Sequence, residues 1–456
     1  MISFSLINFS NNLSWDKVTN LIFKLQKRLF KVSYVYDRKK LYVLQKIIVQ
    51  LNYSRLLAIK LVNHSVFNEN LPGVDGYVSL NFYESFELNE FLKYNWNNWI
   101  FQNLKKVSLF DNDGKIIVKK VPVISDRVWC YLVKFAIEPV HEALFHPFNL
   151  GYRSQYFIYE IQELILLNLS KFSFGSKKRV LKLDLSQNFC INNYSFLMEK
   201  LIAPRCIKLG IFKLLEKGFV LEFSNNCIFN KVDFSSLLLN IFLNGIEKLH
   251  NCIRYGYFLL FFLNPIDNEK ELLSKIYLFL SKLDLKFNIS EIELSSIING
   301  FDFLGWHFKF SYKSYNNLCI FPSFDNYNKF LTRIKVIINN SNYGSIIKAS
   351  KIYPIVKDWK EYHKYSDLFD LNYSLCFIKK RAFKIFKSES KQDFYSSKSL
   401  LLKCFSVFNI FNKDLKNLYN KFFKPLNFRH LVFLFNRGGE GFKYFYFCIH
   451  CGVILL

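Results

Sequence analysis

The stretch IRYGYFLLFFL at residues 253–263 carries the clearest turn and strand signals in the 456-residue sequence. Tyr255-Gly256 predicts a turn, because glycine adopts backbone conformations that other residues avoid. The apolar run Tyr257–Leu263 that follows predicts a buried strand. A second run, VLKLDL at residues 180–185, predicts another buried strand that ends near Asp184. With helical patterns on both sides of them, these strands predict an α+β fold.

None of these apolar runs is long enough for a membrane. The longest, Tyr257–Leu263, covers seven residues, whereas a membrane-spanning helix needs about 20. Residues 1–12 show neither the apolar core of a secretory signal nor the Arg- and Ser-rich pattern of an organelle import peptide. Apart from Cys448 and Cys451, the cysteines are widely scattered, which indicates reduced thiols rather than a disulfide framework.

Residues 14–66 predict helices, because apolar side chains recur at spacings of three and four, for example from Val18 to Leu29. Between residues 17 and 60 the polar positions are basic, and Asp37 is the one acidic residue. Solvated helix faces ordinarily mix both signs, so this pattern favours a polyanionic partner. A helix that lies on a membrane surface or binds calmodulin is the alternative interpretation.

The composition indicates a folded, strongly basic protein. Lys and Arg number 62 against 36 Asp and Glu, a net charge of +26, while 51% of the residues are hydrophobic. The apolar content excludes a disordered basic tail, and the charge exceeds what solubility requires. We expect nucleic acid as the partner first and an acidic membrane surface second. The 52 Phe and 27 Tyr are typical of an AT-rich coding sequence, as in organelle genomes, and this bias accounts for part of the Lys excess.

Several further segments follow one another along the chain in a recognisable order. They are the stretch from Trp15 to Pro72-Gly73-Val74-Asp75-Gly76, then Val121-Pro122-Val123-Ile124-Ser125-Asp126-Arg127, Glu138-Pro139, Phe148-Asn149-Leu150-Gly151-Tyr152-Arg153, Asn240-Ile241-Phe242-Leu243-Asn244 and Gly300-Phe301-Asp302-Phe303-Leu304-Gly305-Trp306. In this order they resemble the group II intron maturase family, and most of all degenerate plastid maturase-like proteins of the euglenoid type. The resemblance implies a reverse-transcriptase-like right-hand fold, in which fingers and palm are followed by an α-helical thumb and domain X.

The same resemblance divides the chain into four parts. Residues 10–80 correspond to a basic helical N-terminal extension, 81–310 to degenerate fingers and palm, and 311–440 to a helical thumb and domain X-like RNA-binding region. Residues 441–456 contain Cys448-Ile449-His450-Cys451-Gly452, which resembles the start of the endonuclease domain of longer maturases, here truncated. Two thiolates so spaced could form half of a zinc site, but a full site needs four ligands, so we expect no metal.

In the family, polymer synthesis uses two metal ions held by carboxylates from two palm strands. Asp184 matches the first carboxylate, in Leu183-Asp184-Leu185 where the family has Asp-Ile. The other two belong to a Tyr-Ala-Asp-Asp turn, and here Tyr257 and Phe258 replace the paired Asp. The family's Pro-Gln-Gly-Gly element is also lost, since residues 229–232 read FNKV. We therefore expect Asp184 to be vestigial and the chain to have no catalytic residues, metal or cofactor.

Family members without reverse transcription act as splicing cofactors that hold intron RNA in its active fold. Such a role needs cations against the phosphate backbone and planar side chains for unstacked bases. Trp359, Tyr362 and Tyr365 could stack on bases or equally form core. The candidate RNA-binding residues are Lys24, Lys27, Arg28, Lys31, Arg55, Lys60, Arg153, Lys379, Lys380 and Arg381.

The expected function is that of a non-enzymatic maturase-like protein. It would bind intron RNA and assist the excision of organellar group II or group III introns, without reverse transcriptase activity. We expect it to be plastid-encoded and to act in the plastid, with the mitochondrion as the alternative, and to use neither a membrane nor a small-molecule substrate. A general organellar RNA scaffold, for example in ribosome assembly, and a residually active reverse transcriptase that uses Asp184 remain alternative functions.

Overall fold

The chain has a mixed α+β fold, as the sequence predicts. The computed structural model describes residues 14–64, 71–110, 116–153, 156, 158–169, 177–186, 194–219, 234–285, 292–311, 317–363, 365–366, 371–390, 394–405, 432–435, 443–447 and 454–455. Within these ranges no helix combines the length and the apolar character that a membrane span requires. The 229–232 element and the Cys448–Cys451 pair lie outside the described residues.

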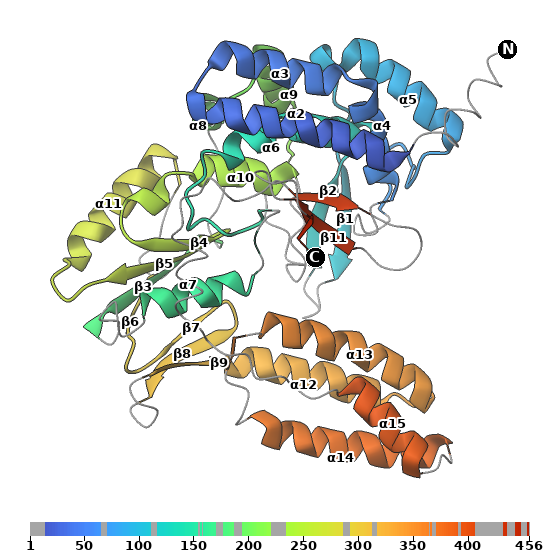
Figure 1. The fold of residues 1–456 in the computed structure, drawn as a ribbon, viewed down its shortest axis with the longest axis vertical. Coiled ribbons are helices and arrows are strands. Elements are labelled where there is room, and N and C mark those ends of the chain that lie inside the picture. The colour runs from blue at the N-terminus through green and yellow to red at the C-terminus, as the bar shows by residue number, and fades with distance from the viewer. Residues whose placement is uncertain are drawn as a thin grey trace.

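A layer of helices forms one end of the molecule (Figure 1). It contains α2 (Trp15–Val35), α3 (Arg38–Gln50), α4 (Asn52–Asn63), α5 (Phe82–Asn95), the short 3-10 helix η1 (Trp96–Asn98), α6 (Ile124–Glu142), α8 (Ser195–Lys200) and α9 (Arg205–Glu216). The predicted helical segment 14–66 thus forms α2, α3 and α4. A two-stranded antiparallel ribbon, β1 (Lys105–Phe110) and β2 (Ile116–Val121), leads into α6.

Helix α6 lies in the middle of this layer and is buried along most of its length. It contains Pro139, which has no N–H, so the carbonyl of Phe135 loses its usual donor four residues on. The side-chain amide of Gln26 in α2 donates to that carbonyl at 3.0 Å. Gln45 in α3 donates to the next carbonyl, that of Ala136, at 3.2 Å. Gln26 therefore supplies the donor that Pro139 lacks, and the two buried glutamines together fix α2 and α3 on α6.

The central sheet is antiparallel, with the strand order β4-β5-β3-β6. Strand β5 is buried along nearly its whole length, which explains its continuous apolar run, and β4 beside it is fully buried. The sheet and its flanking helices comprise α7 (Glu160–Asn168), β3 (Arg179–Asp184), α10 (Phe234–Leu243), the 3-10 helix η4 (Ile246–Lys248), β4 (Cys252–Tyr255), β5 (Phe258–Leu263), α11 (Glu269–Lys282) and β6 (Ile292–Ser296).

A second sheet links this part to a C-terminal helical bundle (Figure 1). The sheet has the order β7-β8-β9, and the bundle has a hydrophobic core of its own. These elements are β7 (Phe301–Phe303), β8 (Trp306–Ser311), β9 (Asn317–Pro322), α12 (Phe324–Asn339), α13 (Ser345–Tyr362), α14 (Leu371–Ser390) and α15 (Phe394–Cys404), followed by a further sheet of β10 (Val432–Phe435), β11 (Lys443–Phe447) and β12 (Ile454–Leu455).

Aromatic side chains pack inside the bundle and also between the bundle and the second sheet. Trp359 is buried and stacks on Phe330, with the ring centroids 4.3 Å apart. Tyr362 packs on the fully buried Trp306, with centroids 4.7 Å apart, and its hydroxyl donates to the Leu304 carbonyl. These two aromatic residues, which the sequence left open between base stacking and core, therefore belong to the core.

We predict that Gly210→Ala destabilises the protein. A Cβ atom there would lie 2.5 Å from Cζ2 of Trp129, whose indole is buried and donates to the Trp96 carbonyl at 2.9 Å. Alanine favours a helix by about 1 kcal/mol over glycine, but overpacking costs about 1–3 kcal/mol. Glu216→Ala at the end of the same helix is the control, because Glu216 is exposed and alanine makes no new contact there. Urea unfolding should show a lower midpoint for Gly210→Ala alone; equal midpoints would contradict the packing.

Candidate functional site

The structure brings together the positions that the sequence compared with a catalytic centre. Asp184 ends β3 directly opposite Phe258, the first residue of β5. The Leu185 N–H donates to the Tyr257 carbonyl at 3.2 Å, so the β4–β5 turn lies beside the end of β3. The Asp184 carboxylate accepts a bond from the Ser186 N–H at 2.9 Å and thereby caps its own turn.

The neighbours of Asp184 at this turn are aromatic. Tyr257 and Phe258 are half-buried and pack against the hydrophobic core. Neither side chain carries a carboxylate, the ligand that magnesium prefers in proteins. Across the described ranges, no three His, Cys, Asp or Glu side chains gather closely enough to hold a metal ion.

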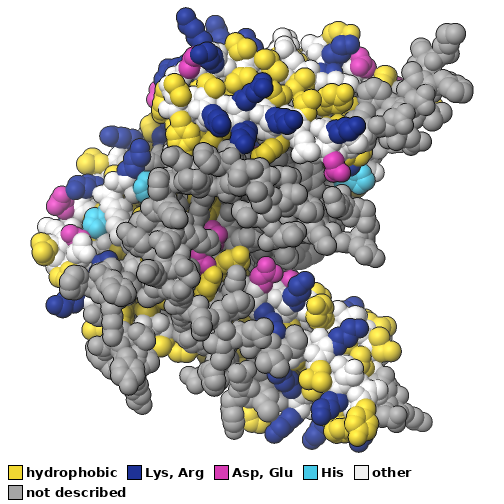
Figure 2. Space-filling view, viewed as in Figure 1, with side chains coloured by type: hydrophobic (Ala, Val, Ile, Leu, Met, Phe, Trp, Pro, Cys, Tyr) yellow, Lys and Arg dark blue, Asp and Glu magenta, His cyan; other side chains and the backbone are white. Residues whose placement is uncertain are grey.

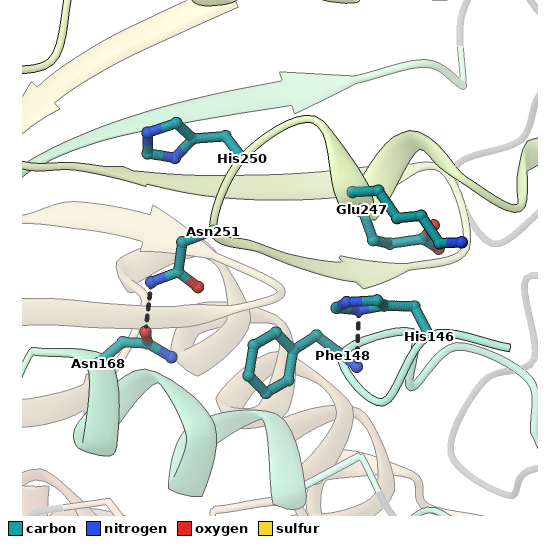
Figure 3. A pocket seen from close by; sticks show the side chains of 7 residues that line it. His146, Phe148, Asn168, Glu247, His250 and Asn251 are labelled. Atoms are coloured by element: carbon teal, nitrogen blue, oxygen red, sulfur yellow. Dashed lines mark hydrogen bonds between the residues drawn. The ribbon is translucent and has the colours of Figure 1, made fainter.

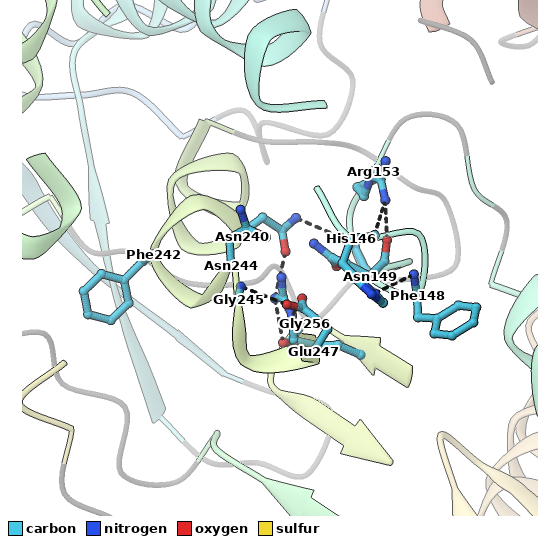
Figure 4. Close-up of polar contacts among 12 residues, drawn as sticks. His146, Phe148, Asn149, Arg153, Asn240, Phe242, Asn244, Gly245, Glu247 and Gly256 are labelled. Carbon is cyan, nitrogen blue, oxygen red and sulfur yellow. Dashed lines mark hydrogen bonds and ion pairs between the residues drawn. The ribbon is translucent and has the colours of Figure 1, made fainter. Parts of the chain in front are cut away.

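A buried polar network holds the β4–β5 turn (Figure 4). Arg254, the third residue of β4, is completely buried and forms an ion pair with the buried Glu247 of η4. The same guanidinium donates to the Asn240 side chain at 3.0 Å and to the Gly256 carbonyl at 3.4 Å. Asn240 in turn donates to the Gly151 carbonyl at 2.8 Å. Four separate segments therefore meet at one arginine.

The Glu247 carboxylate is ionised at neutral pH. Burial by itself raises the pKa of a carboxyl group, but the adjacent Arg254 guanidinium outweighs burial and lowers the pKa of Glu247 below its ordinary value. The carboxylate also accepts a bond from the Gly245 N–H at 3.0 Å. A buried charge of this kind is tolerated because it is paired and hydrogen-bonded.

Residues 148–151 lie along the outer edge of β4. The Leu150 N–H donates to the Arg254 carbonyl and the Arg254 N–H to the Phe148 carbonyl, each at 2.9 Å. A Cβ atom on Gly151 would lie 2.2 Å from the backbone nitrogen of Gly256. Glycine at 151 is therefore required by the close approach of two backbones at the turn.

Two arginines expected to bind RNA are structural. Arg153 is 4% exposed, forms an ion pair with the buried Glu142 and donates to the Asn149 carbonyl at 2.6 Å. Arg55 is also 4% exposed and donates to the Asn89 side chain at 3.2 Å and to the Gln50 carbonyl at 2.6 Å. These expectations are corrected, because both guanidinium groups are engaged inside the protein.

Lys60 is half-buried, and its ammonium lies 3.9 Å from the centroid of the Trp15 ring. This contact is a cation–π interaction that joins α4 to the start of α2. Burial lowers the pKa of Lys60 from its ordinary value. Its ammonium therefore packs on the indole rather than standing free in solvent.

The other N-terminal candidates lie on one surface. In α2, Lys24, Arg28 and Lys31 are exposed, while Lys27 is half-buried at the side. Helical spacing of three, four and seven places these side chains on the same side of the helix. Figure 2 shows Lys and Arg gathered over this end of the molecule. The α2–α3 basic surface consists of Lys17, Lys24, Lys27, Arg28, Lys31, Arg38, Lys39, Lys40 and Lys46.

The C-terminal candidates lie on α14. Lys380 and Arg381 are exposed, and Arg381 donates to the Asn339 side chain at the end of α12 at 2.9 Å. Lys379 is half-buried, with its ammonium 6.0 Å from the Phe405 ring centroid. Figure 2 shows further cations over the bundle. The bundle basic surface consists of Lys329, Arg333, Lys335, Lys379, Lys380, Arg381, Lys384 and Lys387.

The Arg254 network could not be found from residue types alone. Sequence reasoning noted Asn240, Gly151 and Arg254 only as parts of separate landmarks, and it did not use Glu247. The available signal was an arginine inside an apolar strand, which needs a buried partner. Sequence does not say which distant acidic residue supplies that partner.

We predict that Glu247→Gln strongly destabilises the protein, because it leaves the Arg254 charge buried and unpaired, at a cost of about 3–5 kcal/mol. The pair's contribution is complete above the ordinary glutamate pKa of 4.5 and is lost as pH falls through the lower pKa of the folded state. Urea midpoints at neutral and acidic pH measure both effects. Glu271→Gln, which breaks the exposed Lys275 pair, is the control and should change little.

A midpoint for Glu247→Gln equal to that of the Glu271→Gln control at neutral pH would contradict the structural role of the pair. The structural role would also be contradicted if the wild-type protein and the Glu247→Gln variant lost stability in parallel as the pH falls.

Two sequence comparisons bear on this chain. The family described as the N-terminal domain of reverse transcriptase matches residues 11–92, which include α2, α3 and α4. The protein named Maturase-like protein 1 of Euglena gracilis is 55% identical over 453 residues, which are 98% of this chain and 98% of that protein. Identity at this level over nearly the whole length establishes common descent.

Among solved structures, a telomerase chain from Candida albicans, determined in complex with the TWJ fragment of telomeric RNA, aligns with a TM-score of 0.31 and 11% identity. The alignment covers 72% of this chain and 63% of the telomerase chain. The match to the Euglena protein is the one that assigns the family. This chain belongs to the maturase-like proteins of the reverse-transcriptase and maturase family.

Proposed function

We propose that the protein binds intron RNA and assists the excision of organellar group II or group III introns, without reverse transcriptase activity. The observation that carries this proposal is the β4–β5 turn, where Tyr257 and Phe258 lie beside Asp184 in a sheet that is otherwise complete. The scaffold of a reverse-transcriptase relative is kept, while its metal-binding side chains are replaced.

The proposal assigns the parts of the fold by resemblance. Residues 10–80 act as the N-terminal extension, 81–310 as fingers and palm with the β4-β5-β3-β6 sheet at the palm, and 311–440 as thumb and domain X. Residues 441–456 are a truncated remnant. In this assignment Asp184 and the β4–β5 turn occupy the catalytic position of the palm.

Two-metal polymerisation needs several carboxylates on both metals. Asp184 supplies one, and its oxygen accepts a bond from the Ser186 N–H at 2.9 Å. Tyr257 and Phe258 supply none. This set of side chains supports loss of nucleotide transfer and leaves RNA binding as the activity.

RNA binding is supported by the two basic surfaces. Within α2 the one acidic residue is Asp16, against Lys17, Lys24, Lys27, Arg28 and Lys31, and exposed Lys and Arg bind phosphate by releasing counterions. The two basic surfaces lie on separate elements, α2–α3 and α12–α14, so each offers cations to RNA, which suits a role in holding a folded intron. The name of the Euglena relative and the AT-rich composition support an organellar, and within that a plastid, location; the mitochondrion is the alternative.

Two other functions have specific support. Phosphate contacts carry no sequence information, so the same surfaces suit a general organellar RNA scaffold, for example for ribosomal RNA. The retained Asp184 favours a residual reverse transcriptase. Primer extension by the purified protein with magnesium distinguishes the latter: our proposal expects no product, and templated synthesis would contradict it.

We predict that the triple variant Lys24→Gln, Arg28→Gln and Lys31→Gln binds intron RNA more weakly and with a flatter salt dependence. Each lost phosphate contact should reduce the slope of log Kd against log salt by about 0.7, or about 2 in total. Fluorescence anisotropy at several salt concentrations measures the slope.

The matched control removes three exposed lysines from α11, Lys270, Lys275 and Lys282, where the acidic Glu269 and Glu271 neutralise part of the charge. It has the same change in net charge and should leave the slope close to that of the wild type. Equal slopes for both triple variants would show that net charge alone governs binding and that the α2–α3 basic surface does not contact RNA.

A further inference from the structure

A cavity of about 550 Å³ lies at the outer edge of the central sheet, beside the edge strand β4 (Figure 3). This volume falls within the range of small-molecule sites. One strand, β5, lies between β4 and β3, so two strand spacings, or about 10 Å, separate β4 from the strand that ends at Asp184. The cavity is therefore distinct from the catalytic position of the palm. Its lining consists of His146, Phe148, Asn168, Glu247, Lys248, His250 and Asn251.

One wall of the cavity is aromatic. The half-buried Phe148 ring meets the His146 ring edge-on, with centroids 5.4 Å apart. The Phe148 N–H donates to Nδ1 of His146 at 3.3 Å, which assigns the His146 proton to Nε2. Burial lowers the pKa of His146, so the ring is neutral at physiological pH. Two flat neutral rings of this kind suit stacking with a nucleobase.

The opposite wall offers polar groups. The Asn251 amide donates to the Asn168 side chain at 2.8 Å and keeps its oxygen and a second N–H for another partner (Figure 3). Nε2 of His250 lies 3.2 Å from Oδ2 of Asp267. Nδ1 of the same ring is buried and has no partner among the described residues.

The lining contains one glutamate and one lysine. Glu247 is neutralised by its ion pair with Arg254, and outside the lining the Asp267 carboxylate lies 3.2 Å from Nε2 of His250. Lys248 is exposed and pairs with no carboxylate among the described residues. A phosphate group is the anion that a nucleic-acid-binding surface would bring to this ammonium.

We infer that this cavity binds a single unpaired ribonucleotide of the RNA, with its base against Phe148 and His146, its edge at Asn251 and its phosphate at Lys248. This inference rests on the proposed function, because it assumes an RNA partner. It adds to that function a site that recognises a nucleotide displaced from an RNA helix. Phosphate contacts on the basic surfaces do not provide such recognition.

The test uses two RNA hairpins that differ by one bulged nucleotide, with 2-aminopurine as the bulge. Stacking and edge contacts should make the bulged hairpin bind about tenfold more tightly than the paired one, and the 2-aminopurine fluorescence should change on binding. The double variant Lys248→Ala and Asn251→Ala alters two exposed side chains. It should reduce the preference severalfold, because the edge and phosphate contacts are lost while the Phe148 and His146 rings remain, and the paired hairpin should bind nearly as in the wild type.

The control variant, Lys270→Ala with Asn299→Ala, removes the same two exposed residue types elsewhere and should keep the preference. A wild-type protein without preference for the bulge, or a Lys248/Asn251 variant that retains it, would overturn the inference while leaving the proposed function intact. Failure to bind either hairpin would instead overturn the proposed function. Free AMP is titrated as a second probe in the absence of RNA. A micromolar Kd for AMP would overturn the assignment to an RNA nucleotide, and a Kd above the millimolar range would support it.

Discussion

The buried ion pair between Arg254 and Glu247 is the constraint on which the centre of the structure depends. It joins β4 to η4, and through Asn240 it also holds α10 and the segment that contains Gly151. Without a partner, either charge would be too costly to keep in the core. The β4–β5 turn, the edge of the sheet and the wall of the neighbouring cavity are thus all positioned by one interaction that water cannot reach.

The same turn contains the positions that the family resemblance compares with a metal-binding centre. Clustered carboxylates repel one another and need a bound cation to stay together. At this turn Asp184 caps its own backbone, and Tyr257 and Phe258 pack on the hydrophobic core. This arrangement needs no cation, so the turn can be kept as part of a scaffold for RNA.

Sequence predicted the parts of the fold that local patterns determine. The helices within residues 14–66 and the strands β3 and β5 were expected, because their apolar spacing is strong. The three-stranded sheet β7-β8-β9 was missed, although each strand pairs with its neighbour along the chain. Its strands are only three to six residues long, which is too short for a clear alternating pattern.

For the candidate site, residue type predicted the exposed cations of α2 and α14 but failed at Arg55 and Arg153. Arginine is normally a surface residue, and only the distant Glu142 and the nearby carbonyl groups make burial of Arg153 possible. The cavity beside β4 was not foreseen either, since its lining comes from three separate stretches of the chain. Asp184, Tyr257 and Phe258, which the resemblance aligned as one centre, lie side by side in the structure.

The central claim is that the protein holds intron RNA on its basic surfaces. The most direct measurement is to cross-link the protein to RNA inside its own compartment and to sequence the recovered RNA, with the cross-linked peptides identified in parallel. The account predicts enrichment of one or a few unspliced group II or group III introns and cross-links on α2, α3 and α14. Enrichment of ribosomal RNA, or no RNA above background, would contradict it.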